Sequence, residues 1–281
     1  MHILLGKALK HIESARDQKF GGVPSGFTRM DAITGGWQKG DLIIIASQPQ
    51  MGKTSFILSL ARNAAVDHQK PIGLFSIELT QMQMLMRLIS LETEINTQKL
   101  LKGELRNDEF YLIREKAKKL MKSPILIDDS PSLSVEEFHM KAKSLKEKKN
   151  IELIIVDCLY YNQLMELGEY DELSNCNVFN KLHKISKELN IPVIVTLQLD
   201  DLGIRAPKIS DLRQPFDVEK EADVIIFLNR PESQGLVEDA KGNSTVGIVE
   251  IEVAKHLNGR IGKEKLNFNS ETGSFSEEPF E

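Results

Sequence analysis

The sequence is poor in the features that mark secreted, membrane-spanning or strongly basic proteins. Its 2 cysteines, Cys158 and Cys176, have no metal-binding spacing and form no disulfide framework, which is typical of a reducing intracellular compartment. No apolar run approaches the ~20 residues that a transmembrane helix needs, so we expect a soluble, cytoplasmic protein without a membrane span. Lysine and arginine number 36 against 41 acidic residues. Any contact with DNA must therefore come from a local patch or from a ring of subunits.

The hydrophobic content, 41% of 281 residues, is enough to bury the core of one large domain or two small ones. Residues 1–20 are expected to form a separate amphipathic helix, in which Leu5, Leu9 and Ile12 recur at helical spacing. The glycine-rich stretch that follows separates this arm from a compact domain, which we place at residues 21–281.

Short apolar runs alternate with helical stretches through most of the chain. Such runs suit strands that are buried on both faces of a parallel sheet. We expect a short helix to begin with a capping box of Thr28 and Asp31 and to end at Gly35. The alternation predicts a doubly wound, mostly parallel α/β domain, closed by a C-terminal β-hairpin at 247–268. The predicted strands are 42–46, 73–77, 125–127, 153–156, 193–197 and 224–228, and the predicted helices are 53–66, 80–92, 109–121, 135–148 and 177–189.

The clearest motif is a phosphate-binding loop directly after the first of these strands. Met51-Gly52-Lys53-Thr54 lies between a strand and a helix, the context of a Walker A motif, because loop amides and the helix N-terminus together form an anion cradle. We expect Lys53 to hold the β and γ phosphates of ATP and Thr54 to ligate Mg²⁺. The usual first glycine of the motif is replaced by Ser47. The predicted nucleotide-binding residues are Ser47, Gln48, Pro49, Gln50, Met51, Gly52, Lys53, Thr54 and Ser55.

Two acidic residues end predicted strands in the same way. Asp157 follows 153–156, and an acid at the carboxyl end of a buried parallel strand faces the phosphate crevice. This is the Walker B position, so we expect Asp157 to hold the coordination shell of Mg²⁺. Glu78 follows 73–77 and is a candidate to orient or deprotonate the attacking water. A charge at the entry to the next helix is the alternative interpretation of Glu78.

Blocks of residues along the chain resemble the motor domain of DnaB-like replicative helicases, a family of RecA-type P-loop ATPases. Their order and spacing hold from Gly22 to about Phe268, which makes the resemblance specific to this family and not only to P-loop ATPases. The blocks are Gly22–Phe27, Asp31, Thr34–Gly36, Gly40–Leu42, Pro49, Met51–Thr54, Phe75–Glu78, Ile127–Asp129, Ile155–Asp157, Lys187–Val193, Ser210–Arg213, Ala222–Val224 and Ala254-Lys255.

The resemblance implies a RecA-like ATPase that couples ATP hydrolysis to translocation on single-stranded DNA during replication. It implies a hexameric ring of identical subunits, with contacts to other replication proteins. Glu78 would be the catalytic glutamate, Gln198 the γ-phosphate sensor, and Lys255 a residue that reaches the neighbouring subunit's nucleotide. Arg213 and Gln214 fall in a loop that would contact DNA. Residues 1–20 resemble a linker helix that docks on the neighbour, although packing on its own domain fits the amphipathic pattern equally well.

The sequence departs from the family pattern away from the phosphate loop. The family's Lys-x-Arg, whose arginine enters the next subunit's site, is Lys255-His256-Leu257 here, and such an arginine is worth about 10³ to 10⁵ in rate in GTPases. Bulk and negative charge also replace family residues in the expected DNA loops, at Gln214-Pro215-Phe216 and Asp200-Asp201. Two functions therefore stay open. One is an active helicase motor, and the other is a divergent relative that binds nucleotide, hydrolyses and unwinds poorly, and acts as an accessory or regulatory subunit.

Overall fold

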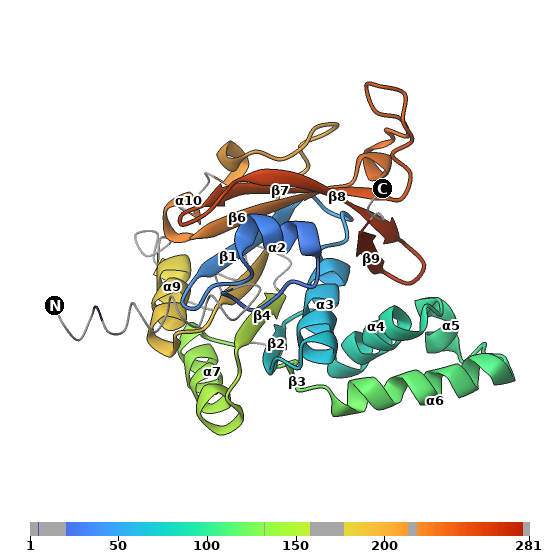
Figure 1. Ribbon diagram of the computed structural model, residues 1–281, viewed down its shortest axis with the longest axis horizontal. Helices are drawn as coiled ribbons and strands as arrows, with labels where there is room; N and C mark the ends of the chain where they lie inside the picture. Colours follow the sequence, from blue (N-terminus) through green and yellow to red (C-terminus); the bar gives the residue numbers. More distant parts are fainter. Residues whose placement is uncertain (1–4, 6–20, 132, 158–176, 213–217, 278–281) are drawn as a thin grey trace.

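A twisted sheet forms the centre of the computed structural model, which describes residues 5, 21–131, 133–157, 177–212 and 218–277 (Figure 1). The order of the described strands is β3-β2-β4-β5-β1-β6-β7-β8-β9. The strands from β3 to β6 in this order are parallel, whereas β7, β8 and β9 add antiparallel. The bounds are β1 Leu42–Ser47, β2 Ile72–Ser76, β3 Ile125–Asp128, β4 Leu153–Asp157, β5 Val193–Gln198, β6 Val224–Asn229, β7 Ile248–His256, β8 Gly262–Asn269 and β9 Ser274–Glu277.

Helices cover both faces of the sheet (Figure 1). Side chains of α7 and α9 form one core cluster with the sheet, and side chains of α2, α3 and α4 form the other. The helices are α2 Thr28–Thr34, α3 Lys53–Arg62, α4 Gln81–Thr93, α5 Thr97–Lys102, α6 Asn107–Lys122, α7 Val135–Lys149, α9 Asn177–Leu189 and α10 Val218–Glu221. A π-helical turn, η1 (Asn63–Asp67), extends α3, and short 3₁₀ turns form η2 (Ile209–Leu212) and η3 (Pro231–Gln234). This layered architecture confirms the predicted doubly wound α/β fold.

The central strand β1 shows why the apolar runs do not alternate in polarity. Leu42, Ile44 and Ala46 belong to the cluster under α7 and α9, while Ile43 and Ile45 belong to the cluster under α3. Because successive side chains of a strand point to opposite faces, a strand covered on both faces must be apolar at every position. All of β1 is buried accordingly.

Local details differ from the sequence-based expectations. The capping box of Thr28 and Asp31 is wrong: the N-cap of α2 is Phe27, which makes no side-chain cap, and the Asp31 carboxylate instead accepts a hydrogen bond of 2.9 Å from the amide of Ser25. The carboxylate thus stabilises the loop before the helix. The helix does end at Gly35, which adopts a left-handed conformation. The segments α5 and β9 were not predicted.

The leading arm expected at 1–20 lies outside the described residues, apart from Leu5. Within the described part of the chain, none of the helices has the length and apolar character to cross a membrane. The division into an arm at 1–20 and a domain at 21–281 stays a prediction.

Two aspartates lie together at the amino-terminal edge of the sheet, before β1 and before β6. The Lys187 Nζ is 3.9 Å from Asp41 Oδ1 and 3.5 Å from Asp223 Oδ1. Asp223 also accepts a 2.8 Å hydrogen bond from the Leu42 amide and lies 3.0 Å from His183 Nε2. Burial, and then the charge of Asp223, raise the pKa of Asp41 to about 6, against the opposing effect of Lys187. The Asp41 carboxylate is therefore destabilising at neutral pH.

We expect Asp41→Asn to raise the free energy of unfolding at pH 7 by about 1–2 kcal/mol, because the amide carries no charge into the buried site. The folded state holds the Asp41 proton more tightly than the unfolded chain, so the gain should shrink as the pH falls below about 6. Urea unfolding at pH 7 and pH 5 measures it. Asp223→Asn is the matched control, and it should lower stability because Asp223 has several partners. If the Asp41→Asn protein is less stable than the wild type at pH 7, then the charged Asp41 carboxylate does not destabilise the fold.

Candidate nucleotide-binding site

The loop between β1 and α3 crosses the carboxyl edge of the sheet. Gly52 is the N-cap of α3 with φ 91°, and Gln50 has φ 63°, so the chain passes through left-handed conformations before the helix starts. Among the described residues, no side chain caps the first turn of α3. The amides of a helix N-terminus without a side-chain cap attract anions, since they carry unpaired donors and the positive end of the helix dipole. The predicted strand, loop and helix context is confirmed.

Lys53, the first residue of α3, is buried, with 5% of its surface exposed. Its Nζ donates to the Ser47 hydroxyl at 3.1 Å, the Ser47 carbonyl at 3.3 Å and the Gln48 carbonyl at 3.4 Å. Burial lowers the pKa of Lys53 to about 8, and the charges of Asp157 and Glu78 only partly oppose this. A buried ammonium held by neutral oxygens is stabilised further when an anion arrives.

Asp157 ends β4 and is almost fully buried, at 2% exposed. Thr196 donates a 3.0 Å hydrogen bond to Oδ1, whereas Oδ2 has no hydrogen-bond partner among the described residues. Burial raises the pKa of Asp157, against the lowering effects of the Thr196 and Thr54 hydroxyls and of the Lys53 charge. A buried carboxylate oxygen without a partner beside a threonine hydroxyl suits a hard divalent cation such as Mg²⁺.

Glu78 lies near Asp157, because Ser76 of β2 pairs with Asp157 of β4 and the chain continues from Ser76 toward α4. Partial burial raises the pKa of Glu78, as does the charge of Asp157, while Arg87 and Lys53 lower it. Arg87, on α4, also lowers the pKa of Asp157. The site therefore combines two acids with two cations. Sequence reasoning missed Arg87, because no motif marks a position inside a helix whose facing depends on tertiary packing.

The remaining predicted residues of the phosphate loop divide into two groups. Pro49 and Gln50 are exposed at the tip, and Ser55 lies one residue beyond Thr54 in α3. Gln48 and Met51 are buried: the Gln48 amide bonds the loop after β5, and the Met51 sulfur accepts a 3.3 Å hydrogen bond from the Arg230 amide. The side chains of Gln48 and Met51 thus fix the loop's position.

Gln198 ends β5 in register with Ser47, so it lies at the same edge as the phosphate loop. On the other side of this loop, the side chains of Arg230 and Phe268 lie together. The Arg230 guanidinium lies 4.9 Å from the ring centroid of Phe268, and that ring packs against Gly52. Flat aromatic and guanidinium groups beside a phosphate site suit the base of a nucleotide. A signal was available, since Arg230 directly follows the buried strand β6 as Asp157 ends β4.

Lys255 does not join this cluster. A bulge between Ile225 and Ile226 in the β6–β7 pairing turns Lys255 away from the face on which Val253 is buried. The Lys255 Nζ donates at 2.6 Å to the carbonyls of Glu219 and Ala222 in its own chain. Its predicted role toward a neighbouring subunit stays a prediction. Arg213 and Gln214, the predicted DNA contacts, lie outside the described residues.

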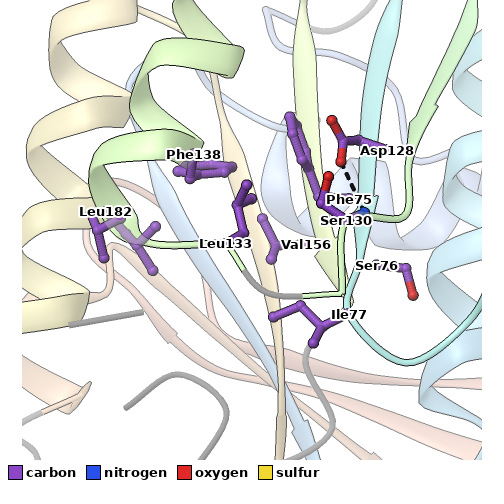
Figure 2. Close-up of a pocket in the computed structure, with 10 residues that line it drawn as sticks. Phe75, Ser76, Ile77, Asp128, Ser130, Leu133, Phe138, Val156 and Leu182 are labelled. Atoms are coloured by element: carbon purple, nitrogen blue, oxygen red, sulfur yellow. Dashed lines mark hydrogen bonds between the residues drawn. The ribbon is translucent and has the colours of Figure 1, made fainter. Parts of the chain in front are cut away.

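A small apolar cavity opens farther along the same edge (Figure 2). Its walls are aromatic and aliphatic, with Phe75, Phe138 and Leu182 among them. Polar groups stand only at its rim, where Asp128 accepts from the Ser130 amide at 3.1 Å and from Lys141 Nζ at 2.7 Å. These partners already satisfy the Asp128 carboxylate at the rim.

The strand order and the loop at the carboxyl edge are those of a RecA-like ATPase domain. The solved ATPase domain of a protein called G40P superimposes with a TM-score of 0.86 at 30% identity, covering 99% of this chain and 98% of that one. The family model of the DnaB-like helicase C-terminal domain matches residues 22–277, so the chain belongs to this family.

Further similarities agree with this assignment. The replicative DNA helicases DnaB of Geobacillus stearothermophilus and Leifsonia xyli are 32% and 33% identical to this chain over 92% and 96% of its length. A solved DnaB-like replicative helicase, described together with its interactions with primase, has a TM-score of 0.83 at 30% identity over 99% of this chain and 67% of that one. The chain spans 57% and 59% of the two curated relatives, a little over half of each.

Proposed function

We propose that this domain binds ATP with Mg²⁺ and hydrolyses it, and that rings of identical subunits use the hydrolysis to translocate on single-stranded DNA in the cytoplasm. The observation that carries the nucleotide part is the buried Lys53 ammonium next to Asp157: among the described residues, the ammonium donates to neutral oxygens alone and Asp157 Oδ2 has no hydrogen-bond partner. Family membership and the similarity to replicative DNA helicases support the translocation part. Unwinding of a forked duplex by the assembled protein tests it.

The residues divide the chemistry among them. Lys53 exchanges its carbonyl partners for phosphate oxygens, while Thr54 and Asp157 are the residues that would hold Mg²⁺. When bound, that ion supplies positive charge to neutralise the phosphates. Glu78 orients the attacking water and accepts its proton, and its raised pKa suits a base better than an ordinary carboxylate would. Gln198 senses the γ-phosphate, because it ends the strand beside the phosphate loop.

Binding of ATP should weaken at alkaline pH, since only the charged form of Lys53 attracts phosphate and its pKa in the free protein is about 8. Between pH 7 and pH 9 the affinity for a non-hydrolysable ATP analogue should fall by about tenfold. Lys53→Arg is the matched variant, because a guanidinium stays charged over this range and should remove most of the pH dependence. Lys53→Ala should abolish binding. Calorimetric titration across this range measures the effect, and a pH-independent wild-type affinity would contradict the assignment of Lys53.

Glu78→Gln should keep nucleotide affinity within about threefold and lower kcat by at least about 100-fold, because the amide preserves shape but accepts no proton. Steady-state hydrolysis and analogue binding, measured on the same preparation, separate the two effects. Glu94→Gln is the control, since Glu94 is an exposed residue at the end of α4, away from the site. Equal losses of affinity and rate in Glu78→Gln would mean that Glu78 is structural.

The turn between β7 and β8 carries the residues expected to meet a neighbouring subunit. Leu257 is 64% exposed and Arg260 is exposed on the same turn. In the proposed ring Leu257 would face the neighbour's γ-phosphate without supplying charge. The turn still presents a guanidinium at Arg260, which is a second candidate for that role.

Leu257→Arg should raise kcat by at least about tenfold, a cautious fraction of the effects known for arginines supplied in trans. The gain should appear only at protein concentrations where rings form, because the arginine acts on another chain's nucleotide. Hydrolysis rates and oligomer size, followed together across concentration, measure this. Ile261→Arg places the same charge at another exposed position of the turn and should give no gain. Brisk wild-type turnover that Leu257→Arg does not change would refute the assignment of Leu257, and Arg260→Ala would then test Arg260.

A further inference from the structure

Gln48 belongs to the phosphate loop, but its side chain is directed into the loop that follows β5. The residue is 3% exposed. Its Oε1 accepts a 2.8 Å hydrogen bond from the Leu202 amide, and its Nε2 donates to the Arg205 carbonyl at 3.0 Å and to the Gly203 carbonyl at 3.5 Å. One amide group thus fixes three backbone positions of a single loop.

The main chain of Gln48 faces the opposite way, toward the nucleotide site. Its carbonyl accepts hydrogen bonds from Lys53 Nζ at 3.4 Å and from the Ser47 hydroxyl at 2.8 Å. The neighbouring Ser47 carbonyl receives both Lys53 Nζ at 3.3 Å and the Leu199 amide at 2.9 Å. When Lys53 moves to phosphate, both carbonyls lose a cationic donor. The loop after β5 is hydrogen-bonded to Ser47 and Gln48, the two residues whose carbonyls lose this donor.

An ion pair ties the loop to the turn η2. Arg205 contacts Asp211 through two hydrogen bonds of 2.8 and 2.7 Å, and Asp211 also accepts from the Lys208 amide at 2.7 Å. A two-pronged arginine–carboxylate pair fixes orientation as well as distance. This described stretch, 177–212, ends at Leu212, and Arg213 follows directly in the sequence.

We infer that Gln48 is a positioning residue that couples the state of the phosphate loop to the segment Leu199–Leu212. This inference rests on the proposed nucleotide binding. It adds a route by which nucleotide binding can change the conformation of residues 199–212, which directly precede Arg213 in the sequence. Occupation of the phosphate loop shifts the Gln48 backbone, and the side-chain amide carries the shift to Leu202 and Arg205. A contiguous set of hydrogen bonds is one physical form that such coupling takes.

Glutamine is suited to this role because its amide both donates and accepts. A carboxylate at this position accepts from the Leu202 amide but repels the Arg205 carbonyl, and a lysine or arginine cannot accept at all. The neutral amide also leaves the charge balance around Lys53 unchanged.

A second glutamine provides a matched comparison. Gln234, in η3, donates through Nε2 to the same two carbonyls, Gly203 at 3.3 Å and Arg205 at 3.2 Å. It lies outside the phosphate loop and has no contact with Lys53 among the described hydrogen bonds. Among the described residues, Gln234 therefore holds the same carbonyls without a direct hydrogen bond to the phosphate loop, to which η3 connects through the Arg230 amide and Met51.

Hydrogen exchange of residues 199–212 tests the coupling, measured on the full chain with and without a saturating non-hydrolysable ATP analogue and Mg²⁺. In the wild type the analogue should change the exchange rate of this segment by at least about threefold. Gln48→Met preserves the side-chain volume but loses the hydrogen bonds, and it should reduce the change to less than about 1.5-fold. Gln234→Met should raise exchange in both states and keep the nucleotide-dependent change. Saturation removes any effect of altered affinity.

The outcomes separate the inference from the proposed function. If the analogue binds but exchange of 199–212 does not respond, or if Gln48→Met responds like the wild type or like Gln234→Met, then Gln48 does not couple the two loops, although nucleotide binding stands. If the wild type binds no analogue, both proposals fall. If Gln48→Met does not fold, Gln48→Glu replaces it, because the carboxylate still accepts from the Leu202 amide but cannot donate to the carbonyls. Gln48→Glu should retain at most about half of the nucleotide-dependent change in exchange, and a full wild-type change would contradict the inference.

Discussion

The buried charges of Lys53 and Asp157 at the carboxyl edge of the parallel sheet are the constraint around which the rest of the structure is arranged. Among the described residues, Lys53 donates to neutral oxygens alone and one oxygen of Asp157 has no hydrogen-bond partner. Such groups are costly to bury, and a folded protein tolerates them when a ligand or a function compensates. Burial is the main reason why the pKa of Lys53 is lowered to about 8 and why the pKa of Asp157 is raised.

The apolar sheet offsets the free energy of burying these charges and fixes the positions of the residues at the strand ends. The strands β1, β4 and β5 are buried on both faces and lie in register, so Ser47 stands beside Gln198 and Ser76 beside Asp157. Parallel strands bring all their carboxyl ends to one edge, where loops have room to carry functional groups. The antiparallel strands β7, β8 and β9 extend this platform and place Phe268 against Gly52. The bulge between Ile225 and Ile226 directs Lys255 toward the carbonyls of Glu219 and Ala222.

The phosphate loop has a double connection to the rest of the domain. Met51 accepts a hydrogen bond from the Arg230 amide after β6, and Gln48 holds the loop after β5. These two side chains anchor the phosphate loop to both flanking strands. A loop anchored in this way can change its neighbours when its own ligand changes, which an isolated anion cradle would not do.

The sequence by itself determined the element types, the parallel sheet, the position of Lys53 at the start of a helix, and the positions of Asp157 and Glu78 at or just after strand ends. These follow from short-range patterns: apolar runs, a Gly-Lys-Thr sequence between a strand and a helix, and acids after strands. It misplaced the cap of α2, because Asp31 bonds the preceding loop and does not close a local capping box. Only the tertiary structure decided the facing of Arg87, the stacking of Arg230 on Phe268, and the reach of Gln48 to Leu202. Each of these depends on register and packing between segments distant in sequence, where the choice of face and partner has no local signature.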